Sequence, residues 1–173
     1  CNVNEGLMNL MKTSRTQYDW IQLGGDMDGQ AAGDLSGTSI SINTNGNIVA
    51  IGAPGANSSN GEVTIYENLA GNWTQIGSSL SGQWGQTGYF GWSVSLSSYG
   101  NIVAVGAYRN NSFVGNVRVF ENIGGSWTQI GQDINGVGQE KSGYSVSLSG
   151  DGSIVAIGAP SSIVKGSYSG SVI

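Results

Sequence analysis

Hydrophobic and polar positions alternate in short runs along most of the chain, and this alternation predicts strands. The segment 93–96, SVSL, alternates serine with aliphatic residues, so Val94 and Leu96 share one face. The segment 101–107, NIVAVGA, is almost wholly apolar, as expected of a strand that is covered on both faces. The segments 115–122, GNVRVFEN, and 127–131, WTQIG, add two further strands. Together they predict one unit of four short antiparallel strands.

This unit occurs about three times in the same order, with the last copy truncated. The tryptophans that open the segment W-x-Q-(I/L)-G are residues 20, 73 and 127, so the repeat is 53 to 54 residues long. GNIVAIGAP at 46–54 recurs as GNIVAVGAY at 100–108 and as GSIVAIGAP at 152–160. Glycines between the first two strands of each copy (NTNGN, SSYGN, SGDGS) supply the positive φ of tight hairpin loops.

Four antiparallel strands in about 53 residues is the layout of a β-propeller blade. The predicted fold class is therefore all-β, with about three blades of a larger propeller, because a single blade cannot bury both its faces. Residues 1–19 precede the repeat as a lead-in or tether, and residues 20–173 hold the blades, the last one truncated. We expect the ring to continue in further chain; assembly of several copies and an open array are the alternatives. Within the lead-in, Leu7, Met8, Leu10 and Met11 are spaced as on one face of a helix, which predicts a short tether or packing turn; a flexible lead-in is the alternative.

Composition excludes several classes of function. Only 10% of the residues are charged, the net charge is −5 and the six Lys and Arg residues are scattered, so nucleic acid is not an expected partner. No run of about 18 apolar residues predicts a transmembrane segment. The chain has no histidine, which removes the commonest general base and the commonest neutral metal ligand. We therefore expect no enzymatic activity and no cofactor.

At GYFGWSVSLS (88–97) and IVAIGAP (48–54) the sequence resembles the FG-GAP repeats of integrin α-subunit-like propellers. Phe90-Gly91 matches the FG element, and Gly52-Ala53-Pro54 and Gly158-Ala159-Pro160 match the GAP element. The resemblance covers residues 20–173. It implies a seven-bladed β-propeller of the kind that serves adhesion, sugar binding or scaffolding.

Many FG-GAP repeats carry a calcium loop in the first hairpin, and the resemblance identifies the matching positions in this chain. They are Ser41, Asn43, Asn45 and Val49; Ser95, Ser97, Tyr99 and Val103; and Ser147, Ser149, Asp151 and Val155. Calcium prefers six to eight oxygen ligands with several carboxylates, so we expect no metal site in these hairpins. Asp26, Asp28 and Asp34 are the alternative candidates for a metal site, because three carboxylates within nine residues could hold a cation. The competing interpretation, which we favour, is that they are turn residues.

The segment 82–92, GQWGQTGYFGW, is rich in aromatic residues. Phe90 and Trp92 are expected to fill space between blades, as the FG position does in this repeat type. Trp84 has no aromatic counterpart in the other copies. Together with Tyr89 it is the candidate binding residue, because exposed aromatic rings stack on sugars and anchor protein contacts.

Asn57, Asn72 and Asn110 begin Asn-X-Ser/Thr sequences and are candidates for N-glycosylation of an exported protein. The only cysteine, Cys1, is compatible with the lipid-bearing first residue of a bacterial lipoprotein; the alternative is that the chain is a fragment of something longer.

These features predict a non-catalytic extracellular or cell-surface module that recognises a protein or a glycan, as adhesion glycoproteins do. The alternative is a structural component of a larger surface assembly, a filament or a virion, whose partners are neighbouring copies of the same chain.

Overall fold

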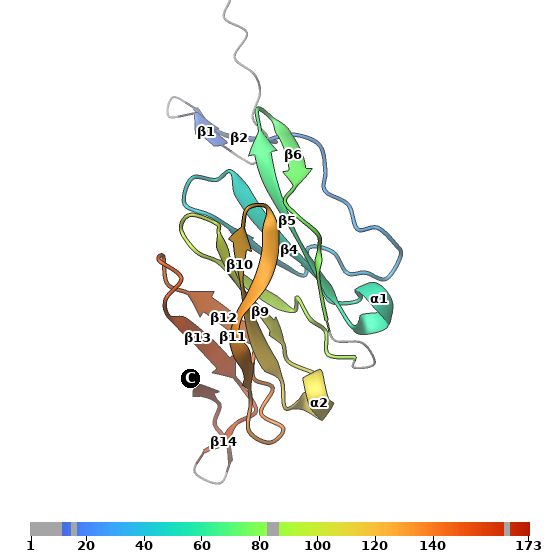
Figure 1. The fold of residues 1–173 in the computed structure, drawn as a ribbon, viewed down its shortest axis with the longest axis vertical. Helices are drawn as coiled ribbons and strands as arrows, with labels where there is room; N and C mark the ends of the chain where they lie inside the picture. Colours follow the sequence, from blue (N-terminus) through green and yellow to red (C-terminus); the bar gives the residue numbers. More distant parts are fainter. Residues whose placement is uncertain (1–11, 15–16, 83–86, 165–166) are drawn as a thin grey trace, which may run out of the picture.

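The computed structural model describes residues 12–14, 17–82, 87–164 and 167–173. It consists of antiparallel sheets that follow one another along the long axis of the molecule (Figure 1). The first sheet contains β3 (Ser39–Ile42), β4 (Ile48–Ala53), β5 (Glu62–Leu69), β6 (Asn72–Gln75) and β7 (Leu80–Ser81), the last two both pairing with β5. The second contains β8 (Ser93–Leu96), β9 (Ile102–Ala107), β10 (Asn116–Ile123) and β11 (Ser126–Asn135). The third contains β12 (Ser145–Leu148), β13 (Val155–Ala159) and β16 (Ser171–Val172).

Smaller elements complete the described part of the chain. Two short hairpins are formed by β1 (Lys12–Ser14) with β2 (Gln17–Ile21) and by β14 (Ile163–Val164) with β15 (Ser167–Tyr168). Two single turns, α1 (Ala56–Ser59) and α2 (Asn110–Phe113), follow the second strand of the first two sheets. None of the helices in the described ranges is long and apolar enough to cross a membrane. The predicted boundary between residues 19 and 20 falls inside β2, and the helical spacing at residues 7–11 lies outside the described residues.

The three sheets repeat one register. Leu96 pairs with Val103 in the second sheet, and the equivalent residues pair in the first and third, as Ile42 with Val49 and Leu148 with Val155. The hairpin between these strands turns on a glycine with positive φ in every copy: Gly46, Gly100 and Gly152, at 72°, 75° and 76°. This is the conformation that glycine adopts without steric cost. The predicted four-stranded antiparallel blades are therefore confirmed for the first two copies.

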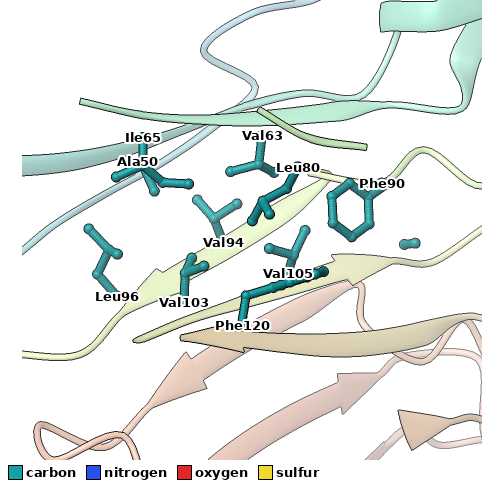
Figure 2. Packing of buried hydrophobic residues seen from close by; sticks show 11 residues of the cluster. Ala50, Val63, Ile65, Leu80, Phe90, Val94, Leu96, Val103, Val105 and Phe120 are labelled. Atoms are coloured by element: carbon teal, nitrogen blue, oxygen red, sulfur yellow. The ribbon is translucent and has the colours of Figure 1, made fainter. Parts of the chain in front are cut away.

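The blades pack face to face and share a core. The first strands of neighbouring blades are in contact, β3 with β8 and β8 with β12. Between the first and second blades, Val63 and Ile65 of β5 face Val94, Val103 and Val105 of β8 and β9, as Figure 2 shows. A smaller cluster, centred on Ala104, Val117 and Ile157, lies between the second and third blades. The fold is that of β-propeller blades stacked on one another, while the number of blades in a complete ring stays a prediction.

The same hydrogen bonds connect each blade to the next. The Leu96 amide donates to Ser41 Oγ (2.9 Å), and one blade further the Leu148 amide donates to Ser95 Oγ (2.9 Å). The indole Nε1 of Trp73 donates to the carbonyl of Leu23 (2.8 Å), and that of Trp127 donates to the carbonyl of Ile76 (2.9 Å). Trp73 and Trp127 therefore have the structural role that their periodicity indicates, whereas the side chain of Trp20 is exposed. We call this recurring set of contacts the blade junction.

The glycine that precedes Ala-Pro in the first copy and Ala-Tyr in the second has a steric function at the blade junction. A Cβ on Gly52 would lie 2.0 Å from the carbonyl oxygen of Gly91, and one on Gly106 would lie 2.2 Å from that of Gly143. Both carbonyls also accept a hydrogen bond from a serine of the preceding blade, Ser39 (2.7 Å) and Ser93 (2.8 Å). A larger residue at either glycine would push the next blade away.

Replacing Trp127 with phenylalanine tests the blade junction. The change keeps an aromatic ring but leaves the Ile76 carbonyl without its donor, so we expect the free energy of unfolding to fall by about 1–2 kcal/mol. Trp20→Phe is the matched control, because the Trp20 side chain is 61% exposed and has no hydrogen-bond partner among the described residues. Urea unfolding of both variants measures the difference. Equal loss in the two would contradict the assigned role of the indole nitrogen.

Candidate functional site

Five aromatic side chains gather at one end of the second and third blades. This aromatic cluster consists of Tyr89, Trp92, Tyr108, Phe113 and Tyr144. Tyr108 is at its centre, with ring centroids 4.7 Å from Trp92, 5.4 Å from Tyr144, 6.0 Å from Tyr89 and 6.3 Å from Phe113. The rings of Tyr89 and Tyr108 are nearly parallel, at 8°, while the others are tilted. Such tilted and offset pairs are the favoured geometry of aromatic contacts.

The cluster is formed by connections and not by strands. Tyr89 and Trp92 lie on the segment that leads into β8, and Tyr108 follows β9 directly. Tyr89 has a positive φ of 53°, and residues at the same place in the other copies share it, Leu35 at 57° and Lys141 at 58°. The backbone bend therefore belongs to the repeat, whereas the aromatic ring at this bend belongs to the second copy alone.

Two cations border the aromatic cluster. The guanidinium carbon of Arg109 lies 4.8 Å from the ring centroid of Tyr89 and 5.0 Å from that of Phe113, and Lys141 Nζ lies 5.9 Å from Phe113. Burial raises the pKa of the Tyr108 hydroxyl above its ordinary value of 10.0, although Arg109 opposes this shift. Tyr108 is therefore uncharged at neutral pH and offers a donor and an acceptor. Rings with polar edges and two cations suit a sugar, particularly an acidic one, or a protein surface.

The cluster is open to solvent on one side. Tyr144 is 43% exposed, and Tyr89, Trp92, Tyr108 and Phe113 are half-buried. Rings held by their neighbours lose little conformational freedom when a ligand stacks on them, which favours binding.

Of the two predicted binding residues, the structure describes only Tyr89. Tyr89 lies in the aromatic cluster, and Trp84 lies outside the described residues. Phe90 is 1% exposed in the core between the first two blades, in agreement with its expected packing role. Trp92 also packs at a blade boundary, between Tyr108 and Tyr144, but as a member of the cluster.

The three aspartates of the alternative metal site are not brought together as ligands. Within the described ranges, no group of three or more His, Cys, Asp or Glu side chains is arranged to hold a metal ion. Asp26 accepts a hydrogen bond from Gln22 Nε2 (2.6 Å), and Asp34 accepts one from the Ala31 amide (2.8 Å). The bond from the Ala31 amide to Asp34 closes a turn, in agreement with the alternative interpretation of these aspartates as turn residues.

The asparagines of the three glycosylation sequences lie at two ends of the blades. Asn57 and Asn110 lie in α1 and α2, at the end that carries the aromatic cluster, and Asn72 begins β6. Asn57 is exposed, has a positive φ of 53°, and donates from Nδ2 to Glu62 (3.1 Å). Asn72 is exposed and Asn110 is half-buried.

Side chains close the first hairpin of each blade at the positions that the resemblance assigns to calcium. Asn43 Oδ1 accepts the Ile48 amide (3.0 Å), Ser97 Oγ accepts the Ile102 amide (3.1 Å), and Ser149 Oγ accepts the Ile154 amide (2.9 Å). In the third copy, the Asp151 carboxylate also accepts hydrogen bonds from Ser149 Oγ (2.6 Å) and the Ser153 amide (3.0 Å). These oxygens are thus engaged in the turn itself.

Many solved structures are similar to this chain, and two of them are described as examples. The periplasmic gluconolactonase of Pseudomonas aeruginosa is 19% identical, with a TM-score of 0.47 over 72% of this chain and 36% of that one. The hydrazine synthase of Kuenenia stuttgartiensis is 14% identical, with a TM-score of 0.47 over 79% of this chain and 33% of that one. This chain thus spans about a third of each matched protein. No protein-family model matches the chain, and neither does any curated protein.

The expectation that the chain is not an enzyme is overturned by this comparison. One of the similar structures is a gluconolactonase, which is an enzyme. The lack of histidine removes the commonest general base, but other side chains also act as general bases, so it does not by itself exclude catalysis.

Sequence reasoning missed Tyr108, Tyr144 and Arg109. A signal for Tyr108 was present, because proline follows Gly-Ala in the first and third copies at Pro54 and Pro160, and tyrosine replaces it in the second. Comparing all three copies position by position, for departures from the repeat, would have found it.

The turn of the third hairpin gives a pH prediction. The hydroxyl of Ser149, followed by the amide and hydroxyl of Ser153, lowers the pKa of Asp151 from 3.8 to about 2. Because the folded pKa is depressed, this stabilisation is fully present above pH 3.8 and is lost as the pH falls through about 2. An NMR titration of the carboxyl carbon should show a midpoint near 2, and Ser149→Ala should raise it. Ser147→Ala is the control, and an Asp151 midpoint at the ordinary value would refute the assignment.

Proposed function

We propose that this chain contributes a recognition surface to an extracellular or cell-surface β-propeller, and that the aromatic cluster binds a glycan or a protein. The supporting observation is the geometry of the cluster, in which Trp92, Tyr108 and Tyr144 lie within 5.8 Å of one another by ring centroid and Tyr144 is exposed. Ring faces stack on sugars, and aromatic residues with arginine dominate protein contact sites.

The position of the cluster supports this proposal. Loops at the end of a rigid repeated scaffold vary without disturbing the strands, so binding residues concentrate there. Trp92 stands where the first copy has Thr38, and Tyr108 stands where it has Pro54. The second copy has thus gained ring area at this end of the blade.

Extracellular location, adhesion and the FG-GAP family belong to the same proposal. They are supported by the FG and GAP elements and by the glycosylation sequences at Asn57, Asn72 and Asn110. Asn57 and Asn72 are exposed, as glycan attachment requires.

A structural role in a larger assembly is the second candidate, and the outer sheets favour it. Ile40 is 70% exposed and Ile42 is 47% exposed, whereas the equivalent Val94 and Leu96 are 8% and 7% exposed beneath the neighbouring blade. Apolar rows that are buried in one copy and open in another mark a surface that accepts a partner.

Substituting ring residues tests the recognition surface. We expect Trp92→Ala and Tyr144→Ala each to weaken binding on a glycan array about tenfold or more, since an aromatic anchor contributes roughly 2 kcal/mol or more. Tyr99→Ala is the matched control, because Tyr99 is 78% exposed on a hairpin and makes no contact with the cluster. Binding measured against an array of acidic and neutral glycans, and against cell-surface protein extracts, identifies the ligand class.

Two outcomes contradict the proposal. One is an array and extracts that show no saturable binding by the full chain. The other is binding that Tyr99→Ala weakens as much as Trp92→Ala does, which would point to general hydrophobic adhesion.

A further inference from the structure

The first blade contains a cavity of about 180 Å³. Its lining residues belong to the segment 27–36, to β4 and β5, and to the turn between these strands. Figure 1 shows the segment 27–36 running along the side of the first blade. Three carboxylate residues line it, Asp28, Asp34 and Glu62, and none of its lining residues is Lys or Arg. We call it the first-blade cavity.

The second blade has the same site, but nearly filled. There the remaining space is only about 10 Å³, lined by Gly82, Gly88, Phe90, Ala107, Asn110, Asn116 and Arg118. Each of these has its equivalent in the repeat among the residues of the first-blade cavity, in the same order Gly29, Asp34, Ser36, Ala53, Ala56, Glu62 and Thr64. The two sites are therefore one feature of the repeat, occupied in one copy and open in the other.

An arginine side chain fills the site in the second blade. The guanidinium carbon of Arg118 lies 4.3 Å from the ring centroid of Phe90 and 5.5 Å from that of Phe120, and Nη2 donates to the carbonyl of Ser81 (2.9 Å). Burial lowers the pKa of Arg118, and the negative charge of Asp133 opposes this shift. A planar cation thus lies beside two aromatic rings and a backbone carbonyl, and Asp133 lies on the paired strand β11.

The first blade lacks this arginine but has a binding site suited to one. Thr64 stands where Arg118 does, and Ser36 stands where Phe90 does, so the volume of two large side chains is open. Tyr66, the equivalent of Phe120, supplies an aromatic wall.

The charge of the site has changed as well. Glu62 stands at the position of Asn116, and Asp28 at that of Ser81. The Glu62 carboxylate accepts hydrogen bonds from Asn57 Nδ2 (3.1 Å) and Thr64 Oγ1 (3.4 Å), which holds it at the cavity. Burial, with the charge of Glu62 as a second cause, raises the pKa of Tyr66, so this phenol stays neutral beside the carboxylate.

We propose that the first-blade cavity binds the guanidinium group of an arginine side chain from a protein or peptide partner, in the place that Arg118 takes in the second blade. The volume suffices, since cavities of about 150 Å³ hold a molecule as large as benzene. Carboxylates pair with guanidinium through two parallel hydrogen bonds, and the ring of Tyr66 offers a face for stacking. The site is separate from the aromatic cluster and does not rest on the function proposed for it.

A peptide titration tests the proposal. The full chain, labelled with ¹⁵N, is titrated with a blocked pentapeptide that has arginine at its centre, and in parallel with the same peptide carrying citrulline or lysine. We expect saturable amide shifts at residues 27–36, 51–57 and 62–66 with the arginine peptide. Citrulline has the same shape without the charge, and lysine has the charge without the planar group, so both should bind about tenfold more weakly or less.

Two variants locate the binding. Glu62→Gln removes one charge and should weaken the arginine peptide about tenfold or more, because hydrogen bonds to charged groups contribute roughly 1.5–3 kcal/mol. Glu67→Gln is the matched control on the same strand, since Glu67 does not line the cavity. Thr64→Arg places the chain's own guanidinium in the site and should abolish binding while the dispersion of the amide spectrum is kept.

Each of three results would overturn the proposal: no saturable shifts with the arginine peptide, equal binding of the citrulline or lysine peptide, or equal weakening by Glu67→Gln. If Thr64→Arg fails to fold, Glu62→Gln against Glu67→Gln still decides. Loss of glycan or protein binding at Trp92 and Tyr144 is measured separately, so the failure of one site does not count against the other.

Discussion

The blade junction is the constraint on which the rest of the structure depends. At each boundary a serine hydroxyl of one blade meets a backbone amide or carbonyl of the next, as Ser41 does with Leu96 and Ser39 with Gly91. These bonds are short only because small residues face one another, with glycine at 52 and 106 where any Cβ would collide with the adjacent carbonyl. Buried polar backbone groups need partners, and the junction supplies them across the sheets and not only within them.

This junction explains why the composition looks unlike that of an ordinary globular domain. Thirty glycines and many serines suggest a low-complexity chain, yet they occupy hairpins and boundaries at fixed intervals. The apolar residues are few but concentrated, since Val63, Val103, Val105 and Val117 are fully buried between blades. The loops therefore contribute little to the stability of the fold, so the residues at the loop end of each blade can differ between copies.

The strands and the first hairpins could be predicted from the sequence because each follows from local pattern repeated three times. The alternation of SVSL fixes its buried face, and the glycine at 100 fixes its turn, without reference to distant residues. The burial of Phe90 was also expected, because Phe90-Gly91 resembles the FG element, which fills space between blades in that repeat type. The second hairpins also follow from the repeat, because an asparagine that recurs in the first two copies closes their turns. The turn amides of Gly71 and Gly125 are bound by the side chains of Asn68 and Asn122.

The aromatic cluster could not be predicted in the same way, since its rings come from segments separated by up to 55 residues along the chain. Only the stacking of blades brings Tyr144 of the third copy onto Trp92 and Tyr108 of the second. The left-handed turns at Asn57 and Asn111 were equally hidden, because asparagine permits that conformation without requiring it.

Departures from a repeat are therefore more informative than the repeat itself, and the first-blade cavity shows why. A repeated position experiences the same backbone and the same neighbours in each copy, so the other copies act as internal controls for its side chain. Where Arg118 gives way to Thr64, the surrounding structure does not collapse to recover the lost contacts. The pairing of β4 with β5 fixes one wall of the cavity, and the hydrogen bond from the Gly55 amide to the Asp34 carbonyl (2.9 Å) ties the segment 27–36 to it. An open volume is the physical consequence of that rigidity. Acidic residues line the open site at the positions of the uncharged Asn116 and Ser81, where the first blade has Glu62 and Asp28. Because the backbone is the same in each blade and the side chains differ, the same position is an open site in the first blade and a nearly filled one in the second, without a change of fold.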